Sequence, residues 1–333
     1  MRFRTIIACL ALSSPALALE AEPDDVYVRV VDGGPALCTV TRMPGEFYMV
    51  YDTGHWTGDE CLAAVTEIVE GETIHLLVLS HADSDHLGAA PEILEAYDVQ
   101  YIVRTGFPRW GTATWEEMNE AVAAEAKFGA SILNLQSLSF EFGEQLLYDD
   151  ATVTLIAGWP VWTDPGPTES ERRNAISIVL RLDYAGGSVL FTGDTVGRRK
   201  SDPDTACKDA EKVMVDNAGS VPIRSNVMIA PHHGGNNGSA SCFIAAVDPD
   251  FVVFSAGHQH DHPTAGAAER YLAHGVPLDR IFRTDRDDDE GGFEWAEGRV
   301  PGCDDVRGDD DVDIVIRANG TVEVAYRGAS DDC

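Results

Sequence analysis

Short apolar runs rich in β-branched residues recur along the chain, and glycine, proline and other turn residues separate them. Stretches with the apolar spacing of a helix lie between several of these runs. Strands are predicted at residues 26–31, 37–41, 47–51, 74–79, 152–156, 176–182, 188–191, 227–229, 251–255 and 314–316. Helices are predicted at residues 59–69, 88–97, 115–128, 239–246 and 264–274. This order favours an α/β fold in which two sheets pack face to face with helices outside.

The N-terminal segment has the pattern of a secretory signal peptide. Arg2 and Arg4 precede a mostly apolar stretch, and Ala16-Leu17-Ala18 is typical of a cleavage site. We therefore predict a signal peptide at residues 1–18 and a single secreted or periplasmic domain at residues 19–333. A lipoprotein signal ending at Cys9 is the weaker alternative, because the apolar segment before it is short. No later stretch has the roughly 18 apolar residues of a membrane span.

Six cysteines follow the predicted signal peptide. An even number of cysteines in an exported chain predicts up to three disulfides. Six cysteines allow fifteen connectivities, which the sequence leaves open, although Cys303 and Cys333 could pair and hold the C-terminal tail. Acidic runs at residues 285–290 and 304–313 are predicted to be solvated loops, and the proline-rich stretch at 159–167 a surface loop.

The strongest chemical signal directly follows the apolar run at 74–79. His81, Asp83, Asp85 and His86 place four ligand-type side chains within six residues. Crowding carboxylates and imidazoles at the end of a buried strand is unfavourable unless a cation compensates them. Residues two apart on an extended segment point the same way, so His81 and Asp83 can share one metal ion while Asp85 and His86 turn toward a second.

Three further strand ends carry similar groups. Asp194 follows the run at 188–191 after a glycine turn, where a carboxylate can bridge two metal ions. His232 and His233 follow the run at 227–229; adjacent histidines are expected to point apart, so that one binds metal and the other orients it or contacts substrate. His260 and His262 follow the run at 251–255.

The order of these elements resembles the metallo-β-lactamase superfamily, and within it the hydrolase domain of ComEC-type DNA-uptake proteins and related secreted phosphodiesterases. The matching segments span roughly residues 26–295. They are residues 30–34, 51–54, 80–88, 174–180, 192–194, 231–234, 262–263 and 283–285. The resemblance implies a four-layer αββα sandwich with two mixed sheets.

The resemblance also implies a metal-ligand set. These residues are His81, Asp83, Asp85, His86, Asp194, His232 and His262. The choice between His232 and His233, and between His260 and His262, stays open. The commoner motif of the superfamily has a histidine where Asp83 stands, and an oxygen ligand there shifts the preference from Zn²⁺ toward harder ions such as Mn²⁺.

The expected mechanism is attack by a metal-bridging hydroxide on a phosphodiester. Asp85 belongs to both the ligand set and the catalytic group, His233 would donate a hydrogen bond to the transition state, and His260 is a candidate general acid. Asn174 and Ser177 are candidates to position substrate; the alternative is a hydrogen-bonded turn at the entry of a strand.

Two other functions compete with this one. A lactone or amide hydrolase of the same fold is the enzymatic alternative. A non-catalytic calcium-binding protein is the other, since the acidic runs offer oxygen ligands and structural calcium, although neither run fits an EF-hand. The net charge of −32 disfavours nucleic acid as a substrate and favours a small diester. A cationic headgroup could contact Trp56, Trp110, Trp159 or Trp162. The sequence leaves the oligomeric state open.

Overall fold

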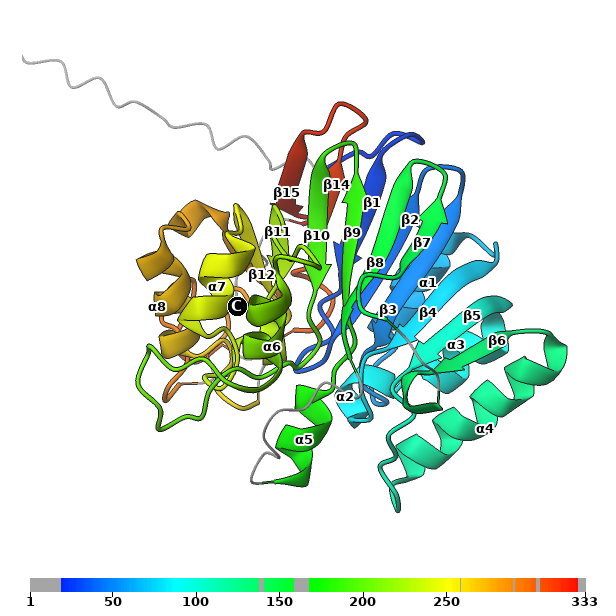
Figure 1. Cartoon of the computed structure of the whole chain (residues 1–333), viewed down its shortest axis with the longest axis horizontal. Coiled ribbons are helices and arrows are strands. Elements are labelled where there is room, and N and C mark those ends of the chain that lie inside the picture. The colour runs from blue at the N-terminus through cyan, green and yellow to red at the C-terminus, as the bar shows by residue number, and fades with distance from the viewer. Residues whose placement is uncertain are drawn as a thin grey trace, which may run out of the picture.

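Two β-sheets pack face to face in the computed structural model, and helices cover their outer faces (Figure 1). The structure describes residues 19–137, 141–158, 168–257, 259–289, 291–303 and 306–328. The signal peptide predicted at residues 1–18, the loop at 159–167 with Trp159 and Trp162, and Cys333 of the predicted Cys303 pairing lie outside these residues.

The first sheet has eight strands in the order β15-β14-β1-β2-β3-β4-β5-β6. Pairing is antiparallel from β15 to β3 and parallel from β3 to β6. In chain order the strands are β1 (Val26–Val30), β2 (Cys38–Met43), β3 (Phe47–Thr53), β4 (Ile74–Leu79), β5 (Val99–Arg104), β6 (Ser131–Asn134), β14 (Val312–Ile316) and β15 (Val322–Tyr326).

The second sheet has seven strands in the order β13-β12-β11-β10-β9-β8-β7. Pairing is antiparallel from β7 to β10 and parallel from β10 to β13. The strands are β7 (Gln145–Tyr148), β8 (Ala151–Ala157), β9 (Val179–Tyr184), β10 (Gly187–Phe191), β11 (Val227–Ile229), β12 (Phe251–Phe254) and β13 (Ile281–Arg283).

Three apolar clusters hold the layers together. One lies between the sheets and includes Tyr51, Leu76 and Phe191. A second packs the first sheet against its helices, and a third packs the second sheet against its own. The first group of helices is α1 (Glu60–Val69), α2 (Ser84–Leu87), α3 (Ala90–Ala96) and α4 (Ala113–Phe128). The second group is α6 (Asp209–Asn217), α7 (Ser241–Val247) and α8 (Ala265–His274). This is the predicted αββα sandwich.

Helix α5 (Glu169–Ala175) stands apart from both groups, next to α2 (Figure 1). Thr168 and Glu171 form a capping box that satisfies backbone N–H groups at its start. The helix then delivers Arg173 and Asn174 to the same end of the sandwich as α2. The strand predicted at 176–182 begins only at Val179, after this helix.

The described parts of the acidic C-terminal runs are mostly loops, as predicted, but the prediction that these loops are solvated is wrong for several of their carboxylates. Asp285 and Asp288 are buried beside the guanidinium of Arg283, and Asp313 is fully buried within β14. Asp285, Asp288 and Glu294 have carboxylate oxygens within 4.8 Å of one another. Arg283 forms ion pairs with all three of them, so an internal guanidinium provides a positive charge at this cluster.

Two disulfides are present in the described part of the chain. Cys38 in β2 bonds Cys61 in α1, and Cys207 bonds Cys242 in α7. The prediction of disulfides is confirmed for these four cysteines. Within the described residues, none of the helices combines the length and the apolar character needed to cross a membrane.

Candidate metal centre

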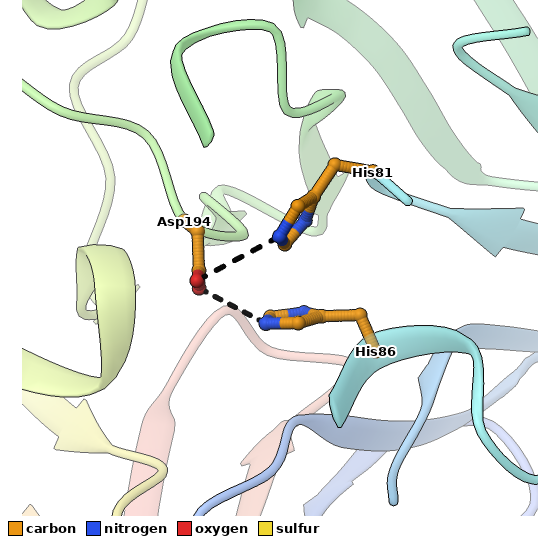
Figure 2. Close-up of side chains that lie close together, drawn as sticks. All are labelled: His81, His86 and Asp194. Atoms are coloured by element: carbon orange, nitrogen blue, oxygen red, sulfur yellow. Dashed lines mark ion pairs between the residues drawn. The ribbon is translucent and has the colours of Figure 1, made fainter. Parts of the chain in front are cut away.

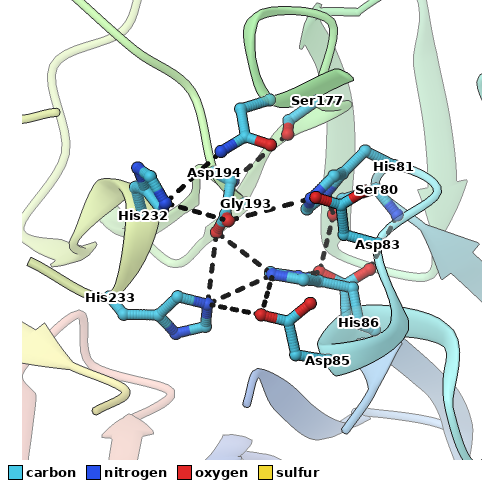
Figure 3. A network of polar contacts seen from close by, with 12 residues as sticks. Ser80, His81, Asp83, Asp85, His86, Ser177, Gly193, Asp194, His232 and His233 are labelled. Atoms are coloured by element: carbon cyan, nitrogen blue, oxygen red, sulfur yellow. Dashed lines mark hydrogen bonds and ion pairs between the residues drawn. The ribbon is translucent and has the colours of Figure 1, made fainter. Parts of the chain in front are cut away.

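The predicted ligands follow the carboxyl ends of four strands. β4 belongs to the eight-stranded sheet and leads into residues 80–86. β10, β11 and β12 belong to the seven-stranded sheet and lead to Asp194, to the His232–His233 pair and to His262. The two sheets therefore contribute groups to one shared site at the end of the sandwich (Figure 3).

Asp194 lies at the centre of this site and is buried. Its Oδ2 atom is 3.7 Å from Nε2 of His81 and 3.7 Å from Nε2 of His232. Its Oδ1 atom is 3.2 Å from Nε2 of His86 and 3.4 Å from Nε2 of His233. Figure 2 shows the carboxylate between the imidazoles of His81 and His86.

Two aspartates extend this arrangement into two groups. Asp83 lies beside His81, with its Oδ2 atom 4.0 Å from Nε2 of that histidine. Asp85 lies on the other side, with its Oδ2 atom 3.9 Å from Nε2 of His86 and 3.8 Å from Nε2 of His233 (Figure 3). Each oxygen of the central carboxylate therefore faces two imidazoles, and a further aspartate lies beside each pair of imidazoles. This donor set is suited to two divalent cations.

All four imidazoles are held through Nδ1, which leaves Nε2 for the centre. The bonds join His81 to Ser80 Oγ, His86 to Asp52 Oδ2, His232 to Asn237 Oδ1 and His233 to the Ser255 carbonyl. The hydroxyl of Ser80 donates to Asp52, so Nδ1–H of His81 donates to Ser80. A histidine that donates through Nδ1 presents a lone pair at Nε2, the form in which imidazole binds a metal ion.

Unsatisfied nitrogen atoms at the centre fit the binding of divalent cations there. Nε2 of His81 is buried and has no hydrogen bond among the described residues. Nε2 of His86 lies 3.2 Å from Nε2 of His233, so two neutral imidazoles that donate through Nδ1 would bring two lone pairs together here. A cation between these atoms would satisfy them, because buried polar atoms without partners are strongly disfavoured.

The pKa values of the clustered residues also depart from their ordinary values. Burial lowers the pKa of His81 well below its ordinary value, and neighbouring His86 lowers it further. Burial disfavours the charged form of His86 as well, but the carboxylates of Asp194 and Asp52 raise its pKa well above the ordinary value. Burial opposes the charge on Asp194, yet the surrounding imidazoles hold its pKa well below the usual range. A proton on His86 thus partly fills the role of a cation.

The expectation that His232 and His233 point apart is wrong. Both imidazoles reach Asp194, at different oxygens. The reason is local backbone geometry, since both histidines have left-handed φ angles (51° and 54°) in the tight turn at Pro231–Gly234. A left-handed pair curls the chain, so consecutive side chains do not alternate as they do in a strand.

His262 and His260 lie farther out. The ring centroid of His262 is 5.7 Å from that of His232 and 6.2 Å from that of His233, with which it is stacked. Burial lowers the pKa of His262 well below its ordinary value. His260 is exposed at the rim, 5.9 Å from the His262 ring. The structure therefore places His262 beside the cluster and His260 at its entrance.

Asn174 and Ser177 contact the ligands themselves. The side-chain nitrogen of Asn174 lies 3.3 Å from Nε2 of His232, and its Oδ1 atom is buried without a hydrogen bond in the described chain. The hydroxyl of Ser177 accepts a hydrogen bond from the backbone N–H of Asp194. A side chain at Gly193 would come within 3.0 Å of Ser80 and Ser177, so glycine allows this close approach.

Several residues of the site were missed in the sequence. Asp52 belongs to a matching motif but carried no assigned role. Asn237 orients His232 from five residues farther along the same loop, and Ser255 orients His233 from just after β12. Arg109 and Arg173 contact Asp83, and no sequence pattern indicated either contact. Except for Asn237, these partners are brought in by the tertiary fold, which a local sequence pattern does not report.

The chain is similar in sequence to proteins of known name. The chain is 27% identical over 292 residues to competence protein ComA of Neisseria gonorrhoeae, covering 84% of this chain and 34% of that protein. It is 24% identical to ComE operon protein 3 of Bacillus subtilis, covering 63% of this chain and 23% of that protein. The chain thus spans about a third or less of these relatives. Among solved structures, the metallo-beta-lactamase fold protein YhfI of Bacillus subtilis covers 78% of this chain and 96% of its own, with a TM-score of 0.47 and 12% identity.

The family model described as the metallo-beta-lactamase superfamily matches residues 31–258, more than half of the chain. This span includes β4 with the motif that follows it, Asp194 and the His232–His233 turn. The chain belongs to the metallo-beta-lactamase superfamily.

Proposed function

We propose that this protein is an exported phosphodiesterase that works with two divalent cations, Zn²⁺ or Mn²⁺. The observation that carries the proposal is the position of Asp194, whose two oxygens face two separate donor groups. The first group is His81, Asp83 and His232, and the second is Asp85, His86 and His233. His233 thus becomes a proposed ligand, and His262 a group that packs beside both histidines of the turn.

Two cations at these positions would activate water and neutralise charge on the oxygens of a diester. The protein's own residues do the rest. Asp52 and Ser80 hold the imidazoles of the β4 motif in place. Asn174, with an unbonded Oδ1 atom next to His232, is positioned to contact a substrate there. His260, exposed at the entrance, is the candidate to protonate the leaving group.

The choice of a diester rests on ligand chemistry. Asp83 and Asp85 make the centre richer in oxygen than a site built mainly of histidines, and oxygen ligands suit harder ions such as Mn²⁺. The competence proteins are relatives by sequence, which keeps nucleic acid among the candidate diesters. The net charge of −32 repels a long polyanion, so a small diester is the preferred substrate.

Export is supported by the cysteines. Two disulfides in the described chain are typical of an oxidising compartment outside the cytoplasm. Together with the pattern of residues 1–18, they favour a secreted or periplasmic protein.

The test is hydrolysis of bis(p-nitrophenyl) phosphate by the purified protein, loaded with Mn²⁺ or Zn²⁺, beside an Asp194→Ala variant. We expect metal-dependent turnover that falls at least ~100-fold in the variant, since the carboxylate that faces both donor groups is lost. Absence of turnover in a wild-type protein that holds two metal ions would reject the phosphodiesterase. Lactones and amides would then be the substrates to test.

A further inference from the structure

Two arginines contact Asp83 on the side that faces away from the metal centre. Arg109 lies in the loop between β5 and α4, and its Nη1 atom is 3.2 Å from Oδ1 of Asp83. Arg173 lies on α5 and bonds the same oxygen through Nε. The other oxygen of Asp83 lies 4.0 Å from Nε2 of His81. One carboxylate therefore separates two guanidinium groups from the proposed ligands.

The contacts with Asp83 leave most of the N–H donors of these two arginines unused. Each guanidinium has five N–H donors. Arg173 uses one of them in a hydrogen bond to Asp83, and Arg109 contacts the same oxygen in an ion pair. Among the described residues, neither guanidinium has a second carboxylate or another hydrogen bond. Arg173 has a side chain only 10% exposed, so its unused donors lie at a nearly buried position next to the site.

The positive charge of these two arginines contrasts with the net negative charge of the protein. The chain carries 56 acidic and 24 basic residues, yet two arginines converge on one oxygen at the proposed active site. Around that site stand four carboxylates, those of Asp52, Asp83, Asp85 and Asp194. Two divalent cations would balance these four charges, and the two arginines would then leave the site positive toward an incoming anion.

Of the two arginines, Arg109 is the one that is open to solvent. Arg109 has a side chain 31% exposed, and its chain neighbours Pro108 and Trp110 line a surface pocket beside it. Trp110 itself is 81% exposed. An anion can therefore approach Arg109 from solvent and reach Arg173 beside it at the shared oxygen of Asp83.

We propose that Arg109 and Arg173 form an anion subsite that binds a second phosphate of the substrate, next to the phosphodiester group at the metal centre. The inference rests on the proposed function and narrows it to diesters that carry a further phosphate close to the reacting one. Guanidinium groups suit this task because their planar donors bind phosphate in pairs.

The alternative is that the arginines only position Asp83. One guanidinium is enough to neutralise and orient a single carboxylate, and a second on the same oxygen adds repulsion between like charges. A positioning role predicts a change in metal affinity when either arginine is replaced. An anion subsite predicts a change in the preference for ligands with two phosphates.

The experiment compares two matched probes, methylenediphosphonate and methylphosphonate, by calorimetry with the Zn²⁺-loaded protein. Bound zinc is measured before and after each titration. We expect wild-type protein to bind methylenediphosphonate at least ~10-fold more tightly than methylphosphonate. Arg109→Gln and Arg173→Gln should each remove most of this preference while zinc stays bound. Arg109→Lys should restore part of it, and Arg224→Gln, which changes an exposed arginine before β11, should keep all of it.

Equal affinity of wild-type protein for the two probes would overturn the subsite. So would variants that lose zinc but keep the preference, since that pattern belongs to a positioning role. Binding of these probes does not require turnover. A protein that prefers the diphosphonate but does not hydrolyse diesters would therefore retain the subsite and refute the proposed phosphodiesterase.

Discussion

Asp52 controls the two histidines of the β4 motif without facing the centre itself. Its Oδ1 atom accepts the backbone N–H of Ser80, and its Oδ2 atom accepts the Ser80 hydroxyl and Nδ1–H of His86. Ser80 in turn accepts Nδ1–H of His81. One buried carboxylate thus fixes the ring orientation of both imidazoles, each of which belongs to a different donor group.

Replacing Asp52 with asparagine should weaken metal binding about 10–100-fold, the usual effect of losing a group that orients a ligand. Asparagine keeps the size of the side chain but provides only one acceptor oxygen, so Ser80 and His86 compete for it. Competition with a chelator of known affinity measures the change. Asp216→Asn, at an exposed position of α6, is the matched control. Equal metal affinity in the Asp52 variant and the control would show that Asp52 has no such role.

A second prediction concerns the pH dependence of stability and depends on Glu211, which lies outside the metal centre. Glu211 is fully buried, accepts the backbone N–H groups of Ser239 and Ala240, and burial raises its pKa from 4.5 to about 7. Between these values the folded protein holds a proton that the unfolded chain has lost. The free energy of unfolding should therefore fall as pH rises from about 4.5 to 7, by about 3 kcal/mol from this group.

Glu211→Gln is neutral at every pH and should lack this contribution. Denaturant unfolding of both proteins across the range gives the difference directly. Parallel curves for wild type and variant would contradict a raised pKa at Glu211.

At the level of elements, the sequence predicted strand bounds best where an apolar run is followed by proposed metal ligands. The bounds of β4 and β11 match the prediction, and both precede proposed ligands. Such strands are buried on both faces, so their apolar residues are continuous and their ends abrupt. The edge strands β6, β7 and β15 were missed, because their half-exposed residues lack that contrast. The central strand β5 was missed too, although Val99 and Ile102 are buried.

The residues of the site could be predicted where they directly follow a buried strand. Side chains within a few residues of a buried strand could be assigned to one end of the fold. The shared approach of His232 and His233 to Asp194 depends on left-handed backbone angles. The contacts of Arg109 and Arg173 depend on a loop and a distant helix meeting at Asp83. Neither leaves a periodic trace in the chain.

The disulfide between Cys207 and Cys242 gives a prediction at this scale. It joins the segment before α6 to α7 and closes a loop with a sequence separation of 35. Loop-closure entropy predicts that a Cys207→Ser/Cys242→Ser variant loses about 3–4 kcal/mol of unfolding free energy. Urea unfolding measures this loss. The Cys38→Ser/Cys61→Ser variant should lose more, since those two cysteines are also packed in an apolar cluster. A loss below about 1 kcal/mol for the first variant would contradict the entropic account.

Over the whole molecule, the metal centre joins the two sheets. His81, Asp83, Asp85 and His86 follow a strand of the eight-stranded sheet, whereas Asp194, His232 and His233 follow strands of the seven-stranded sheet. No single sheet provides a complete donor group. In addition, the net charge of −32 opposes compaction, and the carboxylates of the centre add to this repulsion where the sheets meet.

Metal binding should therefore stabilise the entire fold, not only the loops that carry the ligands. Cations that bind the folded chain alone raise the free energy of unfolding by about 2.7 kcal/mol when free metal exceeds the dissociation constant a hundredfold. We expect thermal unfolding of the chelator-treated protein to shift to higher temperature as Zn²⁺ or Mn²⁺ is added. Asp194→Ala should reduce this shift sharply, because it removes a carboxylate whose two oxygens face both donor groups. Replacing His274, an exposed histidine at the end of α8, should leave the shift intact. If the Asp194 variant gained as much stability from metal as the wild type, the cations would have to bind elsewhere, and the sheets would be held together by their apolar interface alone.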